Sequence, residues 1–330
     1  MRNSIDIFQC PVCCGDLAVE NECVLCKENG HRFDIVDDIP LMFVESGEGE
    51  HADKITQKVK LFYEENPFPN YDESDNPGLL ISKAETSVFA KMLNDELPFN
   101  IRILEVGCGT GQMANYLSLA HRYVFGVDLS LNSLLLANNF KKMNSLKRSS
   151  FYQMNLFKPI FKIDSFHIVI CNGVLHHTHE AYEGLREITK LLKKGGYVVI
   201  GLYNRYGRLF TNIRRVIFKL SGSSLHFIDP YLKRKDVAKL KKKTWFLDQY
   251  NNPHETTHTF GEVLRWFEQT GIEFISSVPE IGKICPLSDD NKLFSKKSSG
   301  NVFSRFITQL TMPFLTNKEG GFFIMIGRKK

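Results

Sequence analysis

Three glycines at alternate positions allow the backbone to approach a ligand closely: Gly107, Gly109 and Gly111. They follow an apolar run over residues 101–106, and glycine lets such a chain turn sharply because it carries no Cβ. A helical pattern resumes afterwards, so the turn delivers a helix N-terminus whose N–H groups face the ligand. A second apolar run, residues 123–127, ends in Asp128, where a carboxylate suits the two ribose hydroxyls of an adenosine-type cofactor. The pattern predicts a cofactor loop at the end of buried parallel strands.

The glycine spacing distinguishes two classes of cofactor. Dinucleotide-binding loops need G-x-G-x-x-G, but here Gln112 occupies the last glycine position. The run Glu105-x-Gly107-x-Gly109-x-Gly111 instead resembles the cofactor loop of class I S-adenosylmethionine-dependent methyltransferases. The resemblance implies methyl transfer from S-adenosyl-L-methionine. It also implies that eight residues bind the cofactor: Glu105, Gly107, Gly109, Gly111, Asp128, Leu129, Asn155 and Asn172. By the same resemblance, Glu105 is expected at the amino group, Asp128 at the ribose, Asn155 at the adenine and Asn172 at the methionine moiety.

Two adjacent histidines, His176 and His177, follow the predicted fourth strand. Methyl transfer chiefly requires that donor and nucleophile are aligned and that water is excluded. Some acceptors also need a base, and a histidine near its working pKa is the natural choice. In the family that this chain resembles, the exit loop of the fourth strand meets the acceptor. We therefore predict a catalytic or acceptor-binding role for this pair, and the alternative is a purely structural loop.

The first cysteines of the chain form two C-x-x-C pairs: Cys10, Cys13, Cys23 and Cys26. Such pairs let two tight turns present four thiolates tetrahedrally, as in structural Zn²⁺ sites. The alternative is a set of ordinary free cysteines; Cys14 is a spare thiol and His31 a substitute ligand. Residues 8–43 resemble the zinc-ribbon activator subunits of translation-apparatus methyltransferases, and also the ribbon fused to bacterial large-subunit rRNA guanine methyltransferases.

Aromatic, histidine and basic residues suggest where an acceptor binds: Tyr63, Tyr71, Tyr203, Arg205, Tyr250, His254 and His258. Residues 254–258 match H-E-x-x-H, but a zinc protease needs that motif on a helix. A capping box at Thr259 places the next helix after the motif. The basic insert 205–243 suits nucleic acid or an anionic lipid surface, and a merely solvated surface is the alternative.

The spacing of apolar segments indicates the elements that hold these residues. Strands are expected over residues 101–106, 123–128, 151–156, 164–172, 191–201, 272–276 and 321–327, and helices over 79–97 and 260–270. Strand–helix alternation that ends in a late hairpin-like strand predicts an α/β fold, the seven-stranded Rossmann-like methyltransferase sheet with helices on both faces.

Three regions are expected along the chain. Residues 1–45 form a zinc ribbon, residues 46–100 a linker and an aromatic and helical arm, and residues 101–330 the methyltransferase domain. Two inserts, 203–258 and 280–319, are predicted to form a cap over the acceptor. The linker is expected at residues 45–53, and the prolines after residue 66 exclude a long helix over residues 61–72.

Composition supports an enzyme of the cytoplasm. The chain of 330 residues is 43% hydrophobic and 24% charged, with a formal net charge of +5. No apolar run reaches the ~20 residues that cross a bilayer, and the N-terminus lacks a signal-peptide pattern. The predicted function is methyl transfer to a small or lipid-like acceptor under the cap. The alternatives are an RNA methyltransferase, acting on rRNA or tRNA, and a non-catalytic cofactor-binding scaffold.

Overall fold

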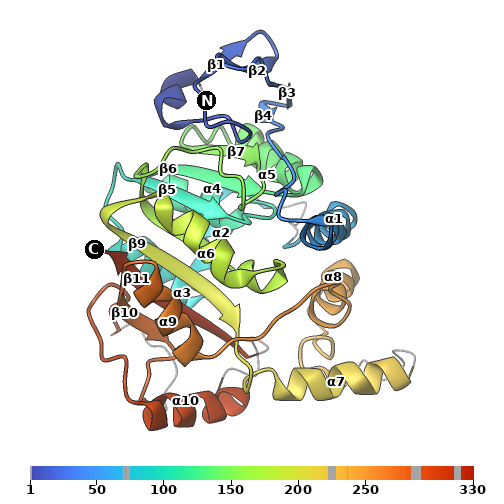
Figure 1. Cartoon of the computed structure of the whole chain (residues 1–330). Coiled ribbons are helices and arrows are strands. Elements are labelled where there is room, and N and C mark those ends of the chain that lie inside the picture. The colour runs from blue at the N-terminus through green and yellow to red at the C-terminus, as the bar shows by residue number, and fades with distance from the viewer. Residues whose placement is uncertain are drawn as a thin grey trace.

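The computed structural model of the chain describes residues 2–69, 71, 75–221, 228–235, 237–283, 291–315 and 321–330. Its centre is a seven-stranded sheet with helices on both faces, and a small four-stranded antiparallel sheet lies at one end (Figure 1). The strands of the large sheet are β5 (Arg102–Val106), β6 (Tyr123–Asp128), β7 (Ser149–Gln153), β8 (Phe166–Asn172), β9 (Leu192–Tyr203), β10 (Ile272–Val278) and β11 (Phe322–Lys329).

The strand order is β10-β11-β9-β8-β5-β6-β7. Strands β5, β6, β7, β8 and β9 pair in parallel, whereas β11 pairs antiparallel with both β9 and β10. The chain runs from β5 outward through β6 to β7 and then returns to β8 on the other side of β5. This reversal opens a crevice at the carboxyl ends of β5 and β8, which is where open α/β sheets bind ligands. The topology confirms the predicted class I methyltransferase sheet.

Two hydrophobic cores lie on the two faces of this sheet, because successive strand residues point to opposite sides. Ile103 packs into one core, and Leu104 packs into the other. The first core contains α2 (Pro77–Glu85), α3 (Val88–Glu96), α4 (Gln112–Leu119) and α5 (Leu131–Met143). The second contains α6 (Ala181–Lys190) and α9 (Phe260–Gln269). The capping box predicted at Thr259 is confirmed, since its side chain and that of Glu262 each bond the other residue's backbone.

Several predicted boundaries were wrong. The single helix predicted over 79–97 is two helices, α2 and α3, because the Ser87 side chain caps a new helix start. The third strand ends at Gln153 rather than at residue 156, and Asn155 forms a turn with Phe157. The predicted linker at 45–53 is shorter, since α1 (Glu50–Glu65) begins inside it. The aromatic segment 61–72 is helical as far as Glu65 and stops before the prolines.

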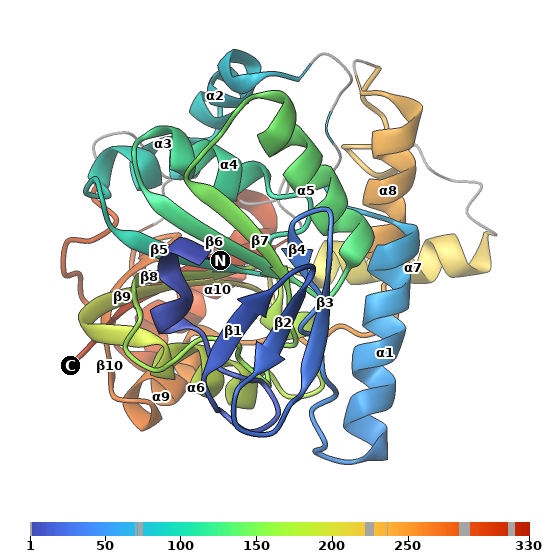
Figure 2. The same cartoon turned by 90° about the horizontal axis from the view of Figure 1, so that it is seen from above.

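The N-terminal sheet consists of β1 (Leu17–Glu20), β2 (Cys23–Cys26), β3 (Arg32–Val36) and β4 (Ile39–Pro40), and it lies close to β7 and α5 (Figure 2). Its hydrophobic side chains join the core of the large sheet. Phe8 is fully buried, with its ring 4.8 Å from that of Phe161 and 5.0 Å from that of Tyr152. The Gln9 N–H donates to the Ile160 carbonyl at 2.8 Å. The ribbon therefore folds against the methyltransferase sheet instead of standing apart from it.

The two predicted inserts contain helices at the edge of the molecule. The first carries α7 (Leu209–Leu220) and α8 (Lys239–Tyr250), and the second carries α10 (Val302–Leu315). Residues 222–227 and 236 of the first insert, and 284–290 and 316–319 of the second, lie outside the described residues.

Candidate cofactor and acceptor site

A cavity of about 560 Å³ opens at the carboxyl ends of β5, β6 and β8. This volume lies within the range of sites that enclose small organic ligands and cofactors. One half of the wall comes from the glycine loop and the strand ends that surround it. The other half comes from α1, the end of β9 and α8, and is rich in aromatic side chains. The two halves form one continuous space.

The glycine loop packs closely between two other segments of the chain. Gly107 and Gly109 have φ angles of +67° and +52°, a region that L side chains rarely adopt. A Cβ on Gly107 would overlap the Val174 side chain, and one on Gly109 would overlap the Phe68 carbonyl oxygen. Phe68 also lines the cavity, so the aromatic arm lies over the loop. Gly111 does not line the cavity; it permits close packing of the loop against Ala137 and Phe151.

Glu105 is a buried acid in the cavity wall, and among the residues that the structure describes its Oε2 atom has no hydrogen-bond partner. Burial and the nearby charge of Asp128 raise the pKa of Glu105 to about 8, against the opposing hydrogen bond from the Ala114 backbone N–H. An unpartnered carboxyl oxygen in a ligand cavity is costly without a cationic or donor group to meet it. The site therefore suits a ligand with an ammonium group at this point.

Asp128 holds the loop as well as facing the cavity. Its Oδ2 accepts the Gly109 N–H at 2.8 Å and its Oδ1 accepts the Ser130 N–H at 2.9 Å. Each carboxylate oxygen can accept a second hydrogen bond, so ribose hydroxyls can still be bound. Leu129 lines the cavity beside it. Glu64, which the sequence did not single out, caps the start of α5 through the N–H groups of residues 131 and 132 and so fixes this turn.

Asn155 and Asn172 both line the cavity, but they differ in how their amides are used. The Asn155 amide donates to the Val44 carbonyl at 3.0 Å and accepts the Phe157 N–H at 3.2 Å, so it mainly orders the turn after β7. The amide nitrogen and oxygen can each make one further hydrogen bond, so the contact with an adenine edge stays a prediction. Asn172, at the end of β8, is exposed to the cavity and is free to take the predicted place at the methionine moiety.

The paired histidines have different environments. His177 lines the cavity, and its Nδ1 lies 2.8 Å from the His254 carbonyl oxygen. A carbonyl only accepts, so Nδ1 carries the proton and Nε2 carries a lone pair. His176 is fully buried against the Tyr203 ring at 4.1 Å, and neither of its ring nitrogens has a hydrogen-bond partner in the described part of the chain. Burial lowers the pKa of both imidazoles, which keeps them neutral at pH 7. Only His177 is placed for chemistry.

A polar network joins three elements in the acceptor half of the cavity. The Tyr63 hydroxyl of α1 donates to Asp248 Oδ1 at 2.9 Å. Gln249 Nε2 donates to Asp248 Oδ2 at 3.0 Å and to the Tyr203 hydroxyl at 2.7 Å. Trp245, on the same helix, lines the cavity, and its buried indole N–H has no hydrogen-bond partner within the described residues. Sequence reasoning singled out Tyr250 on this helix but did not predict Trp245 or Gln249 as site residues. The signal that was available was an Asp one helical turn after a Trp in a lysine-rich segment.

Comparison with known proteins agrees with this geometry. A family model described as a methyltransferase domain matches residues 104–200, from β5 to β9. These residues contain Glu105, Asp128, Asn172 and His177. The core of this chain is a class I S-adenosylmethionine-dependent methyltransferase domain.

The alignments of this chain with relatives of known sequence or structure cover only part of each relative's length. An uncharacterized protein of Synechococcus sp. is 24% identical over 250 residues, which is 68% of this chain and 60% of that protein. A ubiquinone biosynthesis O-methyltransferase of Glaesserella parasuis is 23% identical over 150 residues, which is 43% of this chain and 63% of that enzyme. The structure of PKMT2 from Rickettsia typhi shares the fold, with a TM-score of 0.51 and 13% identity over 74% of this chain and 52% of that chain. The chain thus spans less than two thirds of the length of these relatives.

Five of the predicted acceptor residues lie away from the cavity of the methyltransferase domain: Tyr71, Arg205, Tyr250, His254 and His258. Tyr71 stacks on Phe140 at 4.4 Å, and Arg205 pairs on the surface with Glu262 at 2.9 Å. The hydroxyl of Tyr250 donates to Asp229. The His254 carbonyl oxygen lies 2.8 Å from His177 Nδ1, and His258 bonds Thr256 at 2.8 Å. As predicted, residues 254–258 are not helical.

The arginines of the basic insert are largely structural. Arg208 is fully buried, with its guanidinium 3.7 Å from the centre of the Tyr203 ring and 2.6 Å from Glu255 Oε2. Arg215 pairs with the same carboxylate at 3.0 Å, and Arg214 lies 3.8 Å from Asp229. These contacts remove three arginines from the surface that the sequence suggested for nucleic acid.

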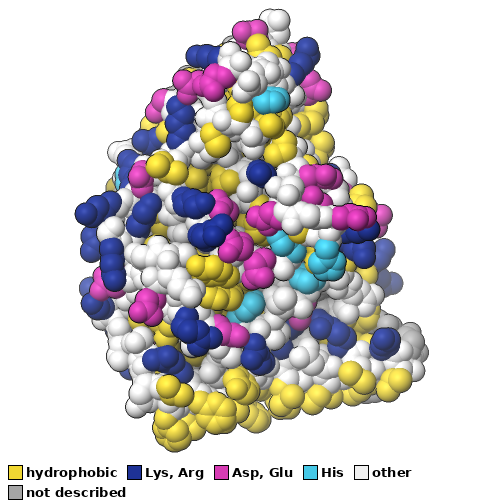
Figure 3. All heavy atoms as spheres, in the orientation of Figure 1, with side chains coloured by type: hydrophobic (Ala, Val, Ile, Leu, Met, Phe, Trp, Pro, Cys, Tyr) yellow, Lys and Arg dark blue, Asp and Glu magenta, His cyan; other side chains and the backbone are white. Residues whose placement is uncertain are grey.

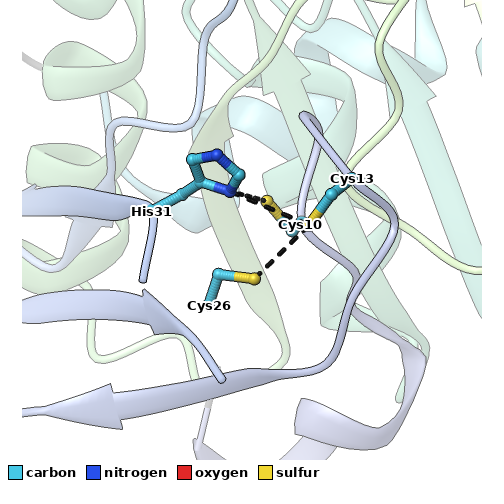
Figure 4. A group of neighbouring side chains, drawn as sticks. All are labelled: Cys10, Cys13, Cys26 and His31. Atoms are coloured by element: carbon cyan, nitrogen blue, oxygen red, sulfur yellow. Dashed lines mark hydrogen bonds between the residues drawn. The ribbon is translucent and has the colours of Figure 1, made fainter. Parts of the chain in front are cut away.

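Four metal-ligating side chains of the ribbon lie together: Cys10, Cys13, Cys26 and His31 (Figure 4). Their ligand atoms lie within 4.8 Å of one another, and three thiols with one imidazole suit tetrahedral Zn²⁺. The predicted ligand Cys23 is not among them; its thiol donates to the Glu20 carbonyl at 3.3 Å. Cys23 and Cys26 lie three residues apart on β2, so their side chains point to opposite faces.

His31 replaces Cys23 because the chain turns between β2 and β3. The Cys26 N–H donates to the His31 carbonyl at 2.8 Å, and the Gly30 N–H donates to the Cys26 carbonyl at 3.0 Å. This turn matches the one at Cys10, where the Cys14 N–H donates to the Cys10 carbonyl at 2.8 Å. The sequence signal was C-x₄-H with Asn-Gly before the histidine, a turn-forming pair.

The raised pKa of Glu105 predicts that cofactor binding by the methyltransferase depends on pH. A ligand ammonium favours the carboxylate form, so below about pH 8 the free protein must lose a proton as it binds. Affinity for S-adenosyl-L-methionine should therefore fall as pH decreases from 8, by up to about tenfold per unit. Calorimetry in buffers of different ionisation enthalpy measures both the affinity and the proton release. If the affinity of Glu105→Gln has the same pH slope as that of the unaltered protein, with the same proton release, the titrating group is not Glu105.

Proposed function

We propose that the protein transfers a methyl group from S-adenosyl-L-methionine to a small or lipid-like acceptor held in the same cavity. The observation that carries this proposal is the continuity of the cavity from Glu105 and the glycine loop to His177 and the aromatic wall. The unpartnered Glu105 Oε2 fits the amino group of the cofactor, and the free acceptor sites of Asp128 fit its ribose. One relative is named as an O-methyltransferase of ubiquinone biosynthesis, which is compatible with an oxygen acceptor.

The residues that line the cavity have different roles in the proposed reaction. S-adenosyl-L-methionine, when bound, supplies a methyl group on a positively charged sulfur. Tyr63, Tyr203 and Trp245 enclose the acceptor half of the cavity and exclude water. The buried indole N–H of Trp245 offers a donor to a polar group of the acceptor. His177, neutral and with Nε2 unprotonated, accepts the proton of an acceptor hydroxyl as the oxygen becomes nucleophilic.

Replacement of His177 tests this proposal. In His177→Ala we expect turnover to fall by about 10²- to 10⁴-fold, the usual contribution of a general base. Cofactor affinity measured by calorimetry should stay within about twofold, because the base makes its contribution in the chemical step. Activity is measured as transfer of a labelled methyl group into lipid and small-molecule extracts of a deletion strain.

The neighbouring histidine provides the control. His176→Phe keeps an aromatic ring against Tyr203, so it should retain most of the activity. An equal loss in both variants would assign the effect to packing. Label found in RNA would contradict the small or lipid-like acceptor, and binding of the cofactor with no labelled product would favour a non-catalytic scaffold.

We also propose that the Cys10, Cys13, Cys26 and His31 cluster holds one structural Zn²⁺. The four donors match the chemistry of closed zinc sites, and two turns of similar geometry present them. The cluster adjoins the core that contains Phe8, so the metal would stabilise the ribbon against the methyltransferase sheet.

A further inference from the structure

Helix α7 turns its apolar side chains to solvent. Leu209, Ile213, Val216 and Leu220 are 48% to 83% exposed and are spaced by three or four residues, so they form one stripe. The opposite face of α7 is directed inward and is mixed in character. It buries Thr211 and Phe218 and directs its arginines to the buried acids Asp229 and Glu255. The outer face of a surface helix in a water-soluble domain is usually polar, whereas that of α7 is apolar.

Helix α10 also turns apolar side chains to solvent. Its exposed stripe consists of Val302, Phe303, Phe306, Leu310 and Phe314, which are 41% to 78% exposed. Its inward face carries the buried polar residues Thr308 and Gln309, and Gln309 Oε1 accepts hydrogen bonds from Asn204 Nδ2 and the Phe260 N–H, each at 3.0 Å. These hydrogen bonds and the fully buried Met312 hold the helix in place, and the outer apolar stripe stays exposed.

The two stripes form one surface at the base of the molecule. The rings of Phe210 and Phe314 lie 5.7 Å apart, and those of Tyr206 and Phe306 lie 5.7 Å apart, so α7 and α10 are neighbours. Figure 3 shows apolar side chains gathered along the base over these helices, with Lys and Arg side chains above them. A contiguous apolar surface of this kind marks an interaction site.

The charges around the base identify the partner. Residues 203–221 and 291–315 contain nine Lys and Arg and no Asp or Glu. Arg208, Arg214 and Arg215 face inward to acids, whereas Arg205, Lys219, Lys292 and Lys296 are exposed. Exposed lysines continue along the first insert at Lys233, Lys235, Lys239 and Lys243. A central apolar stripe with basic flanks matches an anionic lipid surface, in which acyl chains meet the stripe and headgroups meet the cations. Pairing with a second copy through this face would bring like charges together, and nucleic acid would leave the stripe uncovered.

We propose that α7 and α10 dock the protein on the surface of an anionic membrane. No helix in the described part of the chain is long and apolar enough to cross a bilayer, so the contact is peripheral. The docking face is joined to the cavity, because Tyr203 lines the cavity and α7 begins six residues later. This proposal does not depend on methyl transfer, although it suits a lipid-like acceptor.

Vesicle flotation with the full chain tests the proposal. We expect binding to vesicles of phosphatidylcholine with phosphatidylglycerol and at least about tenfold weaker binding to phosphatidylcholine alone. Ile213→Asp and Phe303→Asp should each reduce binding to the anionic vesicles by at least about tenfold, because each places a negative charge in the stripe. Ile163→Asp is the matched control. Ile163 is 67% exposed, and the N–H of the preceding residue, Lys162, donates to the Ile7 carbonyl at the ribbon end of the molecule.

Each possible outcome either supports or overturns the proposal that α7 and α10 dock on an anionic membrane. Binding that both stripe variants lose and the control keeps supports the proposal. Failure of the unaltered protein to bind anionic vesicles overturns it, and so does equal binding to both vesicle types. Light scattering is run in parallel without lipid. A stable dimer that Ile213→Asp dissociates would overturn the proposal in favour of a second copy. Circular dichroism and S-adenosylhomocysteine binding establish that each variant is folded.

Discussion

Gly107→Val is expected to reduce S-adenosyl-L-methionine binding by at least about 100-fold. Two effects combine. The φ angle of +67° costs a β-branched residue on the order of 1–2 kcal/mol, and the added side chain overlaps Val174 in the exit loop of β8. The loop must then move away from Asp128 and from the cavity wall. Isothermal titration with S-adenosylhomocysteine measures the loss directly.

A second glycine separates strain from site geometry. Gly271 has a φ angle of +70°, but a Cβ there meets nothing within 4 Å and lies outside the cavity. Gly271→Val should therefore lose the folding stability that the backbone strain costs and retain nearly full affinity. Equal loss of binding in the two variants would show that global destabilisation is the cause, and full binding by Gly107→Val would place the cofactor elsewhere.

Cys26→Ser is expected to remove the bound zinc and to lower the melting temperature by on the order of 10 °C. Structural zinc contributes roughly 10–16 kcal/mol of apparent binding free energy in small zinc domains, although part of this is retained by the remaining ligands. A loss of several kcal/mol shifts the melting temperature by on the order of 10 °C in a domain of this size. Cys26 is buried in the shared core, so its loss should loosen the contact between ribbon and sheet. The zinc content measured by elemental analysis should fall from about one zinc per chain to nearly none.

Cys23→Ser is the matched variant, since both cysteines lie on the four-residue strand β2. It should keep its zinc and its melting temperature, because the Cys23 thiol points away from the cluster and bonds the Glu20 carbonyl. Loss of zinc in Cys23→Ser, with retention in His31→Ala, would restore the four-cysteine site that the spacing first suggested.

The sequence determined those features that depend on neighbours along the chain. The glycine loop, Glu105 and Asp128 were found because a tight turn and a strand end each have local chemical requirements. The strands β5, β6 and β8 were recognised from apolar runs, and the start of α9 from its capping box at Thr259. Such signals rest on backbone conformation within a few residues, which is why they could be read without a structure.

Only the tertiary structure decided which side chains meet. Tyr63 and Asp248 are 185 residues apart in sequence, and no local pattern connects them. The two histidines look equivalent in sequence, yet one faces the cavity and the other is buried beside Tyr203. Of the two inserts predicted to form a cap, the first lines the cavity through α8, whereas no described residue of the second lines it.

Helices α7 and α10 and the metal cluster show most clearly why sequence spacing alone did not determine which side chains meet. A periodic apolar stripe predicts a buried face, but α7 and α10 leave such stripes exposed. Their inner faces instead bury Phe218 and Met312 and bring polar side chains to Asp229, Glu255 and Asn204. A C-x-x-C pair predicts two ligands, but on an extended strand the same spacing sends the thiols to opposite faces. Sequence spacing determines which groups are available, and the fold determines the direction in which each one points.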